Sequence, residues 1–257
     1  MKSTTLPGLL MGTLAVLCLI LALLGLRQAL QRTSWSPGRR KNIFWITTGV
    51  VAGWVILVGI LAGSGWTAQF DQFPPRPLLV VFLPMVALLI IAFSKGFTTL
   101  LAAVPPHWLV LFQSFRIVVE LLLWQGFLKG LVPVQMTFEG LNFDILAGVL
   151  ALVAGGLMLR QKRAARTIGI TYNIIGLALL LNIITIAILS MPTPMRYFMN
   201  KPANIIVATF PFIYLPAVVV VLAFGFHVFS LRQLLLKKSA TLTEPMAERN
   251  GTNMAVQ

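Results

Sequence analysis

Charged residues are scarce in this sequence, and acidic residues are the scarcest. Only 10% of the 257 residues are charged, and Asp and Glu together number six. An average soluble domain carries about 25% charged residues. This shortage, together with a hydrophobic fraction of 58%, excludes an ordinary soluble domain and predicts a protein that is solvated by lipid.

The residues that usually build disulfides, metal sites and nucleophilic sites are also few. Cys18 is the single cysteine, so no disulfide forms within the chain, and the two histidines are His107 and His227. No HExxH, CxxC or phosphate-loop motif and no Ser–His–Asp spacing is present. We therefore predict no cofactor and no metal. A haem held between His107 and His227 is the alternative, and their expected places at helix ends near the membrane surface argue against it.

Long apolar runs are what the sequence has instead, and there are seven of them. Each is near the length of about 20 residues that a helix needs to cross a bilayer. We predict an all-α polytopic membrane protein with seven transmembrane helices in a single domain, 1–236. The expected spans are 6–26, 43–63, 78–93, 106–127, 144–159, 168–189 and 205–230, with a short surface helix from Gly96 to Val104. The polar segment 237–257 is expected to be a disordered cytoplasmic tail.

The net charge of +14 comes from basic residues in the short segments between apolar runs. This distribution argues against a nucleic-acid partner and is typical of orientation signals. Five basic residues lie in 27–41, one is Lys95, four lie in 160–166 and four lie beyond Ser230, which makes fourteen in alternate segments. The expected orientation therefore has the N-terminus outside and the C-terminus in the cytoplasm.

Two opposite charges, Arg116 and Glu120, fall inside the fourth span. Arg116 lies about 15 Å along the helix from Pro106, which is about half of the hydrocarbon thickness. Glu120 follows one turn later on the same face, so we expect the two side chains to pair directly. Gln113 lies one turn earlier. Because a charge at the bilayer centre costs about 2.5–3.5 kcal/mol, this polar stripe is expected to face the helix bundle.

The stripe has a structural and a functional interpretation, and the sequence leaves both open. In the first, the pair neutralises itself and cross-links helices through Asn173, Asn182 or Tyr214. In the second, Glu120 changes its protonation state, or Arg116 holds an anion, during a transport cycle. Transport or binding of a small solute or ion is the function that a charge at mid-depth favours.

A set of polar residues is expected to meet at the outer side, above this stripe. They are Asp71, Arg76, Glu139, Asn142, Asp144, Arg196, Tyr197 and Lys201. If their loops fold inward, they form a ligand pocket, and a membrane sensor or binding protein becomes the second candidate function; ordinary solvated loops are the alternative. The third candidate is a membrane enzyme that acts on a lipid, with Glu120 or Glu139 as acid or base.

Small-residue pairs occur in the second span, at Gly49–Gly53 and at Gly59–Gly63. Such pairs let helix backbones approach closely in lipid, where van der Waals contact drives association. They fit tight packing within one bundle, and they also fit a homo-oligomer.

Three segments carry a resemblance to known proteins: FQSFRIVVELLLW, PVQMTFEGLNFDIL and PTPMRYFMNKPANIIVATFPFIYLP. They resemble segments of an uncharacterised family of bacterial multi-span inner-membrane proteins. The resemblance covers most of the chain beyond the first span. It implies a multi-pass protein of the bacterial cytoplasmic membrane, and it implies no activity.

Overall fold

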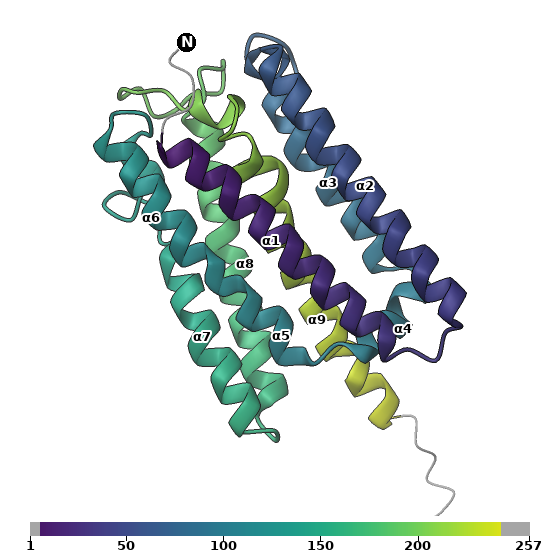
Figure 1. Cartoon of the computed structure of the whole chain (residues 1–257). Helices are drawn as coiled ribbons and strands as arrows, with labels where there is room; N and C mark the ends of the chain where they lie inside the picture. Colours follow the sequence, from purple (N-terminus) through teal and green to yellow (C-terminus); the bar gives the residue numbers. More distant parts are fainter. Residues whose placement is uncertain (1–5, 243–257) are drawn as a thin grey trace, which may run out of the picture.

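The computed structural model describes residues 6–242, and these residues form helices and turns with no strand. The α-helices are α1 Leu6–Gln31, α2 Pro37–Gly63, α3 Arg76–Ala92, α4 Lys95–Ala103, α5 Pro106–Leu111, α6 Phe115–Leu128, α7 Asp144–Arg160, α8 Ala165–Leu189 and α9 Val220–Leu242. Figure 1 shows the longer helices running along one another in a single bundle. The all-α prediction is confirmed.

Five helical segments within residues 6–242 are long and apolar enough to cross a membrane alone. They are α1, α2, the combined segment of α5 and α6 (Pro106–Leu128), α8 and the segment Leu215–Leu236. α3 and α4 are bent by 85° at the break between them and make a sixth if they are one broken span. α7, with 17 residues, is shorter than these five segments. The structure therefore gives a polytopic helical membrane protein with five or six such segments, where the sequence predicted seven.

Local chemistry explains where several helices begin. Ser36 caps α2, because its hydroxyl accepts a hydrogen bond from the backbone N–H of Arg39 at 3.4 Å, and Pro37 suits the first turn. The second helix thus begins before the expected residue 43. Ser94 caps α4 in the same way through Phe97 N–H, at 3.3 Å, which confirms the short helix expected there.

The last predicted span differs most from the structure. It was expected as helix from Ile205, yet regular helix is absent until a π-helical turn, Leu215–Val219, which leads into α9. Pro211 and Pro216 each lack the backbone N–H that an α-helix needs, which disfavours regular helix over this stretch. At its other end α9 reaches Leu242, so residues 237–242 of the expected disordered tail are helical. Residues 243–257 lie outside the described part.

Two side-chain hydrogen bonds attach the π-helical turn to α2. A π turn departs from the α-helical pattern of hydrogen bonds, and the Trp54 indole N–H donates to the carbonyl of Ala217 at 3.0 Å. Tyr214 donates its hydroxyl hydrogen to the carbonyl of Val55 at 3.2 Å. Tyr214 therefore joins α2 to this turn and does not support the Arg116 stripe as expected.

Replacing Trp54 by Phe tests this attachment. We expect Trp54→Phe to lower the free energy of unfolding by about 1–3 kcal/mol, because the buried Ala217 carbonyl loses its side-chain donor. Denaturant unfolding of the purified protein measures the change. Trp45→Phe is the matched control, since Trp45 is exposed on α2, and it should leave the stability unchanged. Equal effects of the two variants would contradict the role of Trp54.

The two ends of the bundle differ in charge. Arg232 of α9 donates to Thr98 of α4 at 2.6 Å, Arg166 of α8 donates to the carbonyl of Leu234 at 2.9 Å, and Arg32 lies over the Trp108 ring. These contacts gather the basic segments at one end, which we call the basic end. The described residues of the basic end include no Asp or Glu. The opposite end, the loop end, consists of the segments 64–75, 129–143 and 190–214.

The glycine pairs of α2 divide between two environments. Gly59 lies against Tyr214, whose hydroxyl oxygen would be 2.6 Å from an added Cβ. Gly49, Gly53 and Gly63 have open space beside them. Gly59 therefore serves packing within the bundle, and the homo-oligomer through the other glycines stays a prediction.

Candidate functional site

Arg116 is buried in the middle of the bundle, and its charged partner is Asp144 of α7. The two residues are 1% and 4% exposed. The Arg116 guanidinium donates from Nε to Asp144 Oδ2 at 2.6 Å and from Nη2 to Asp144 Oδ1, the bidentate geometry that arginine and carboxylate prefer. The predicted direct pairing of Arg116 with Glu120 is therefore wrong: within residues 6–236, the Arg116–Asp144 pair is the ion pair that forms.

Close approach of α7 to α6 explains this choice of partner. A Cβ added to Gly148 would lie 2.8 Å from the backbone nitrogen of Ile117, so only glycine lets the two backbones come this near. Asp144 is the first residue of α7, one turn before Gly148. The contact at Gly148 therefore sets the Asp144 carboxylate beside the guanidinium of Arg116, which lies next to Ile117 in the sequence.

The remaining guanidinium donors reach α8 and α9. Arg116 Nη1 donates to the carbonyl of Gly176 at 3.2 Å and lies 3.0 Å from His227 Nε2. Because a guanidinium can only donate, Nε2 is the acceptor and carries no hydrogen. His227 Nδ1 then donates to Asn173 Oδ1 at 2.8 Å, and Asn173 Nδ2 donates to Ser230 Oγ at 2.8 Å. This network joins α6, α7, α8 and α9 and fixes His227 as the neutral Nδ1–H tautomer.

His227 therefore lies elsewhere than the sequence suggested. It was expected near a membrane surface, yet it is fully buried. Both of its ring nitrogens have hydrogen-bond partners, so neither is free to coordinate the iron of a haem. His107 is partly exposed near the start of α5. Among the residues that the structure describes, no three of His, Cys, Asp and Glu come close enough to hold a metal ion.

Glu120 is 1% exposed and contacts a neutral side chain instead of a cation. Asn142 Nδ2 donates to Glu120 Oε2 at 2.7 Å and to the carbonyl of Met136 at 3.0 Å. Asn142 Oδ1 accepts from the backbone N–H of Asp144 at 3.0 Å. The segment 129–143 thus folds into the bundle, and Asn142 and Asp144, which were expected at the outer mouth, are part of the buried site.

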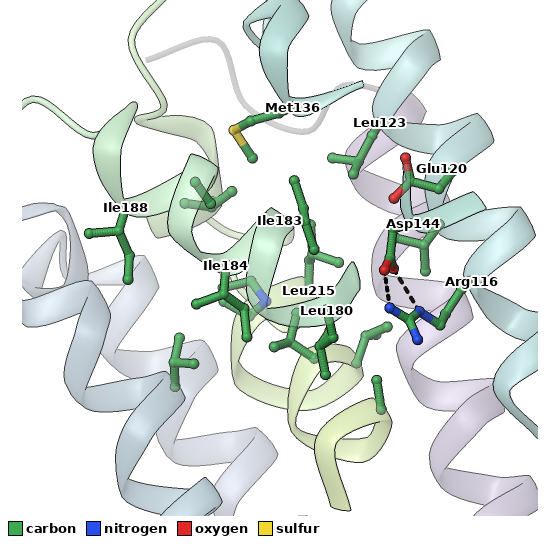
Figure 2. A pocket seen from close by; sticks show the side chains of 18 of the residues that line it. Arg116, Glu120, Leu123, Met136, Asp144, Leu180, Ile183, Ile184, Ile188 and Leu215 are labelled. Atoms are coloured by element: carbon green, nitrogen blue, oxygen red, sulfur yellow. Dashed lines mark hydrogen bonds and ion pairs between the residues drawn. The ribbon is translucent and has the colours of Figure 1, made fainter. Parts of the chain in front are cut away.

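A largely apolar cavity lies beside these carboxylates, between α3, α6, α8 and α9. It encloses about 750 Å³ of empty space, its open mouth included. Its walls are mostly aliphatic and aromatic side chains, among them Val81, Phe82, Phe115, Val119, Leu180, Ile183, Ile188 and Val219. Figure 2 shows Glu120 and the Arg116–Asp144 pair on one wall, with Ile184 and Ile188 on the opposite side. Of the two acidic groups of this wall, Asp144 is paired with Arg116 and Glu120 forms no ion pair.

The other residues of the predicted stripe have separate partners. Gln113 is buried and does not line the cavity, and its Nε2 donates to the carbonyl of Ala223, a lining residue, at 2.9 Å. Asn173 joins the Arg116 network as expected. Asn182 is exposed on α8 and donates to the carbonyl of Leu141 at 2.9 Å.

The remaining outer-mouth residues do not line this cavity. Asp71, Tyr197 and Lys201 are exposed. Arg76 lies over the Trp66 ring, at 4.6 Å from its centroid. Glu139 accepts from the Trp124 indole N–H at 2.6 Å, and Arg196 donates to carbonyls of its own loop, those of Phe198 and Asn200. They are loop residues with local partners, which matches the alternative that the sequence left open.

His227, Ser230 and the carbonyl of Gly176 are the parts of the network that sequence reasoning missed. Their signal was weak but present: His227 and Ser230 are three residues apart and therefore share one face of a helix. Two polar residues on one face of an apolar span need partners inside the bundle. Nothing in the residue pattern matches that face to Asn173.

Comparison with known proteins gives a family and no activity. No curated protein and no solved structure matches the chain. The model of a family described as "Domain of unknown function (DUF8737)" matches residues 73–235, which include α3 to α8, most of α9 and every residue of the buried network. The match covers most of the chain beyond the first span, as expected. Since it covers more than half of the chain, the protein belongs to the DUF8737 family.

Proposed function

We propose that this protein binds a small solute or ion at Glu120 and carries it across the membrane. The observation that supports the proposal is a buried carboxylate that forms no ion pair, on the wall of an apolar cavity. A charge in such a place is costly. A bound cation or proton removes that cost, so binding at Glu120 is favourable.

Charge accounting favours Glu120 over Arg116 as the binding group. The charge of Arg116 is balanced by Asp144, and His227 is neutral in the tautomer that its partners impose. The ionised form of Glu120 therefore leaves the cluster with a net charge of −1. Arg116 and Asp144 serve as a cross-link that holds α6 and α7 together around the site.

The proposal includes seven crossings, with the N-terminus outside and the C-terminus in the cytoplasm. α7 lies alongside α6 and α8, and 17 residues is the lower limit of the range of about 17–25 that spans a bilayer. The charge of the basic end supports placing that end in the cytoplasm. The resemblance noted above supports a bacterial cytoplasmic membrane.

Glu120→Gln tests the proposal. Proteoliposomes adsorbed on a solid-supported membrane receive concentration jumps of H⁺, Na⁺, K⁺ or an alkylammonium ion, and the transient current is recorded. We expect the native protein to give a current and Glu120→Gln to lower it about tenfold or more, because a charge-assisted interaction of about 1.5–3 kcal/mol is lost.

Glu139→Gln is the matched control, because Glu139 is an exposed glutamate of the adjacent loop. Its current should equal that of the native protein. A Glu120→Gln variant that folds and conducts like the native protein would overturn the proposal.

A membrane enzyme that acts on a lipid is the second candidate, and the apolar lining of the cavity favours it. Such a cavity admits an acyl chain, and Glu120 would act as acid or base. Lipid turnover in the same proteoliposomes separates the candidates: an enzyme converts lipid without any ion gradient, and Glu120→Gln abolishes the conversion.

A further inference from the structure

We propose that the ligand of this cavity is a lipophilic cation, an apolar body that carries one positively charged nitrogen, and that it reaches Glu120 from the lipid between α3 and α8. This inference rests on the proposed role of Glu120 as the binding group. It adds the chemical class of the ligand and its route.

The hydrogen-bond partners of Arg116 exclude an anionic ligand. Nε and Nη2 of the guanidinium bind Asp144, and Nη1 binds the Gly176 carbonyl and His227. An anion would have to displace Asp144, which would leave a second carboxylate buried without a partner. The uncompensated charge of the cavity wall is therefore the negative charge of Glu120, and a positively charged ligand group would bind beside it.

The lining of the cavity selects an apolar body. Apart from Arg116, Glu120 and Asp144, the side chains that line it are apolar. A hydrated metal ion or a sugar would lose water there and find few replacement hydrogen bonds, which is costly. An aliphatic or aromatic body gains about 25 cal/mol for each Å² that it buries.

The arrangement of helices points to entry from the lipid. α3 packs against α9 and the π-helical turn, and α8 packs against α7 and α9. Side chains of both α3 and α8 line the cavity, which therefore lies between these two helices. Phe82 of α3 lines the cavity and is 43% exposed. Ile184 and Ile188 of α8 face it from the side away from Glu120 (Figure 2). A lipid-soluble molecule can pass between these apolar side chains without crossing a polar barrier.

Carbodiimide labelling tests both the route and the ligand class. Dicyclohexylcarbodiimide is neutral and lipid-soluble and adds to protonated carboxyl groups that it reaches from the membrane. The native protein in phosphatidylcholine vesicles is treated with it, and the rate of labelling at each carboxyl group is followed by peptide mass spectrometry. We expect labelling at Glu120, none at Asp144, and none at position 120 in Glu120→Gln.

Protection by three amphiphiles with the same ten-carbon chain then identifies the class. Decyltrimethylammonium should slow the labelling of Glu120 about tenfold, while decanol and decyl sulfate should leave it within about twofold, because only the first supplies a positive charge. A two-chain cationic lipid, added to give the same surface charge, controls for the altered pH at the membrane surface and should not protect.

The outcomes separate this inference from the proposed function. If Glu120 is labelled but decyltrimethylammonium protects no better than decanol, the ligand class is wrong and Glu120 stays accessible. If Glu120 is not labelled in the native protein, the route from the lipid is wrong. In both cases the ion currents decide separately whether Glu120 is a transport site.

Discussion

Asp144→Asn should lower the free energy of unfolding by about 3–5 kcal/mol, the cost of removing one partner of a buried ion pair. Arg116 is 1% exposed, so its charge cannot turn to water when the Asp144 carboxylate is lost. The remaining partners of the guanidinium, the Gly176 carbonyl and His227, are neutral. The substitution keeps the shape of the side chain, so the effect reports charge and not packing.

Unfolding can be followed through Cys18, because it is the single cysteine of the chain and is buried. A thiol-reactive dye becomes fluorescent as denaturant exposes this side chain. Asp71→Asn is the control, since Asp71 is exposed, and it should change the stability by less than about 0.5 kcal/mol. If Asp144→Asn costs no more than Asp71→Asn, the cross-link between α6 and α7 does not stabilise the bundle.

A double-mutant cycle extends this result to Glu120. Glu120 lies one helical turn from Arg116 and can take over as its partner when Asp144 is neutral. We therefore expect Glu120→Gln together with Asp144→Asn to cost more than the sum of the single changes, by about 0.5–3 kcal/mol. Additive costs would mean that the Glu120 carboxylate does not interact with Arg116, even when Asp144 is neutral.

Gly176→Ala should have the second large effect on stability. A Cβ added there would lie 2.5 Å from Cε1 and 2.9 Å from Nε2 of His227. His227 is fully buried and is held by hydrogen bonds to Arg116 and Asn173. Overpacking of this kind costs about 1–3 kcal/mol, and displacing His227 from Arg116 and Asn173 adds about 1 kcal/mol for each hydrogen bond lost.

Gly156→Ala on α7 provides the contrast, because a Cβ there meets nothing within 4 Å. It should stabilise the protein by about 0.5–1 kcal/mol, as Ala does relative to Gly inside a helix. The same dye assay measures both variants. Combining Gly176→Ala with His227→Ala relieves the overlap and should recover part of the loss. Equal stability of the two glycine variants would contradict the close contact of α8 and α9.

The predicted helix boundaries agree with the structure within about one residue at three places where the sequence signal is local. The start of α7 at Asp144, the short helix at Lys95–Ala103 and the start of α5 at Pro106 follow from hydropathy, from Ser94 and from the prolines. The failure over 205–214 is also local in origin, because Pro211 and Pro216 lie in an apolar run whose hydropathy alone indicates helix. Hydropathy measures the preference for lipid, and it does not measure whether the backbone can form its hydrogen bonds.

The partners within the site were harder to predict, since they depend on contacts between distant segments. Spacing along one helix made Glu120 the obvious partner of Arg116, but Gly148 lets α7 approach closely enough for Asp144 to take that place. In the same way, the inward fold of the segment 129–143 moves Asn142 from the expected outer mouth to Glu120.

The sequence by itself determined that the chain is a bundle of membrane helices with a charged pair of residues, Arg116 and Glu120, kept away from lipid. The reason is that hydropathy and the cost of a buried charge act on each segment separately. Only the tertiary structure decided that Arg116 is neutralised by Asp144 and that Glu120 faces an apolar cavity without forming an ion pair. That decision depends on how closely particular helix surfaces approach, which no single segment encodes.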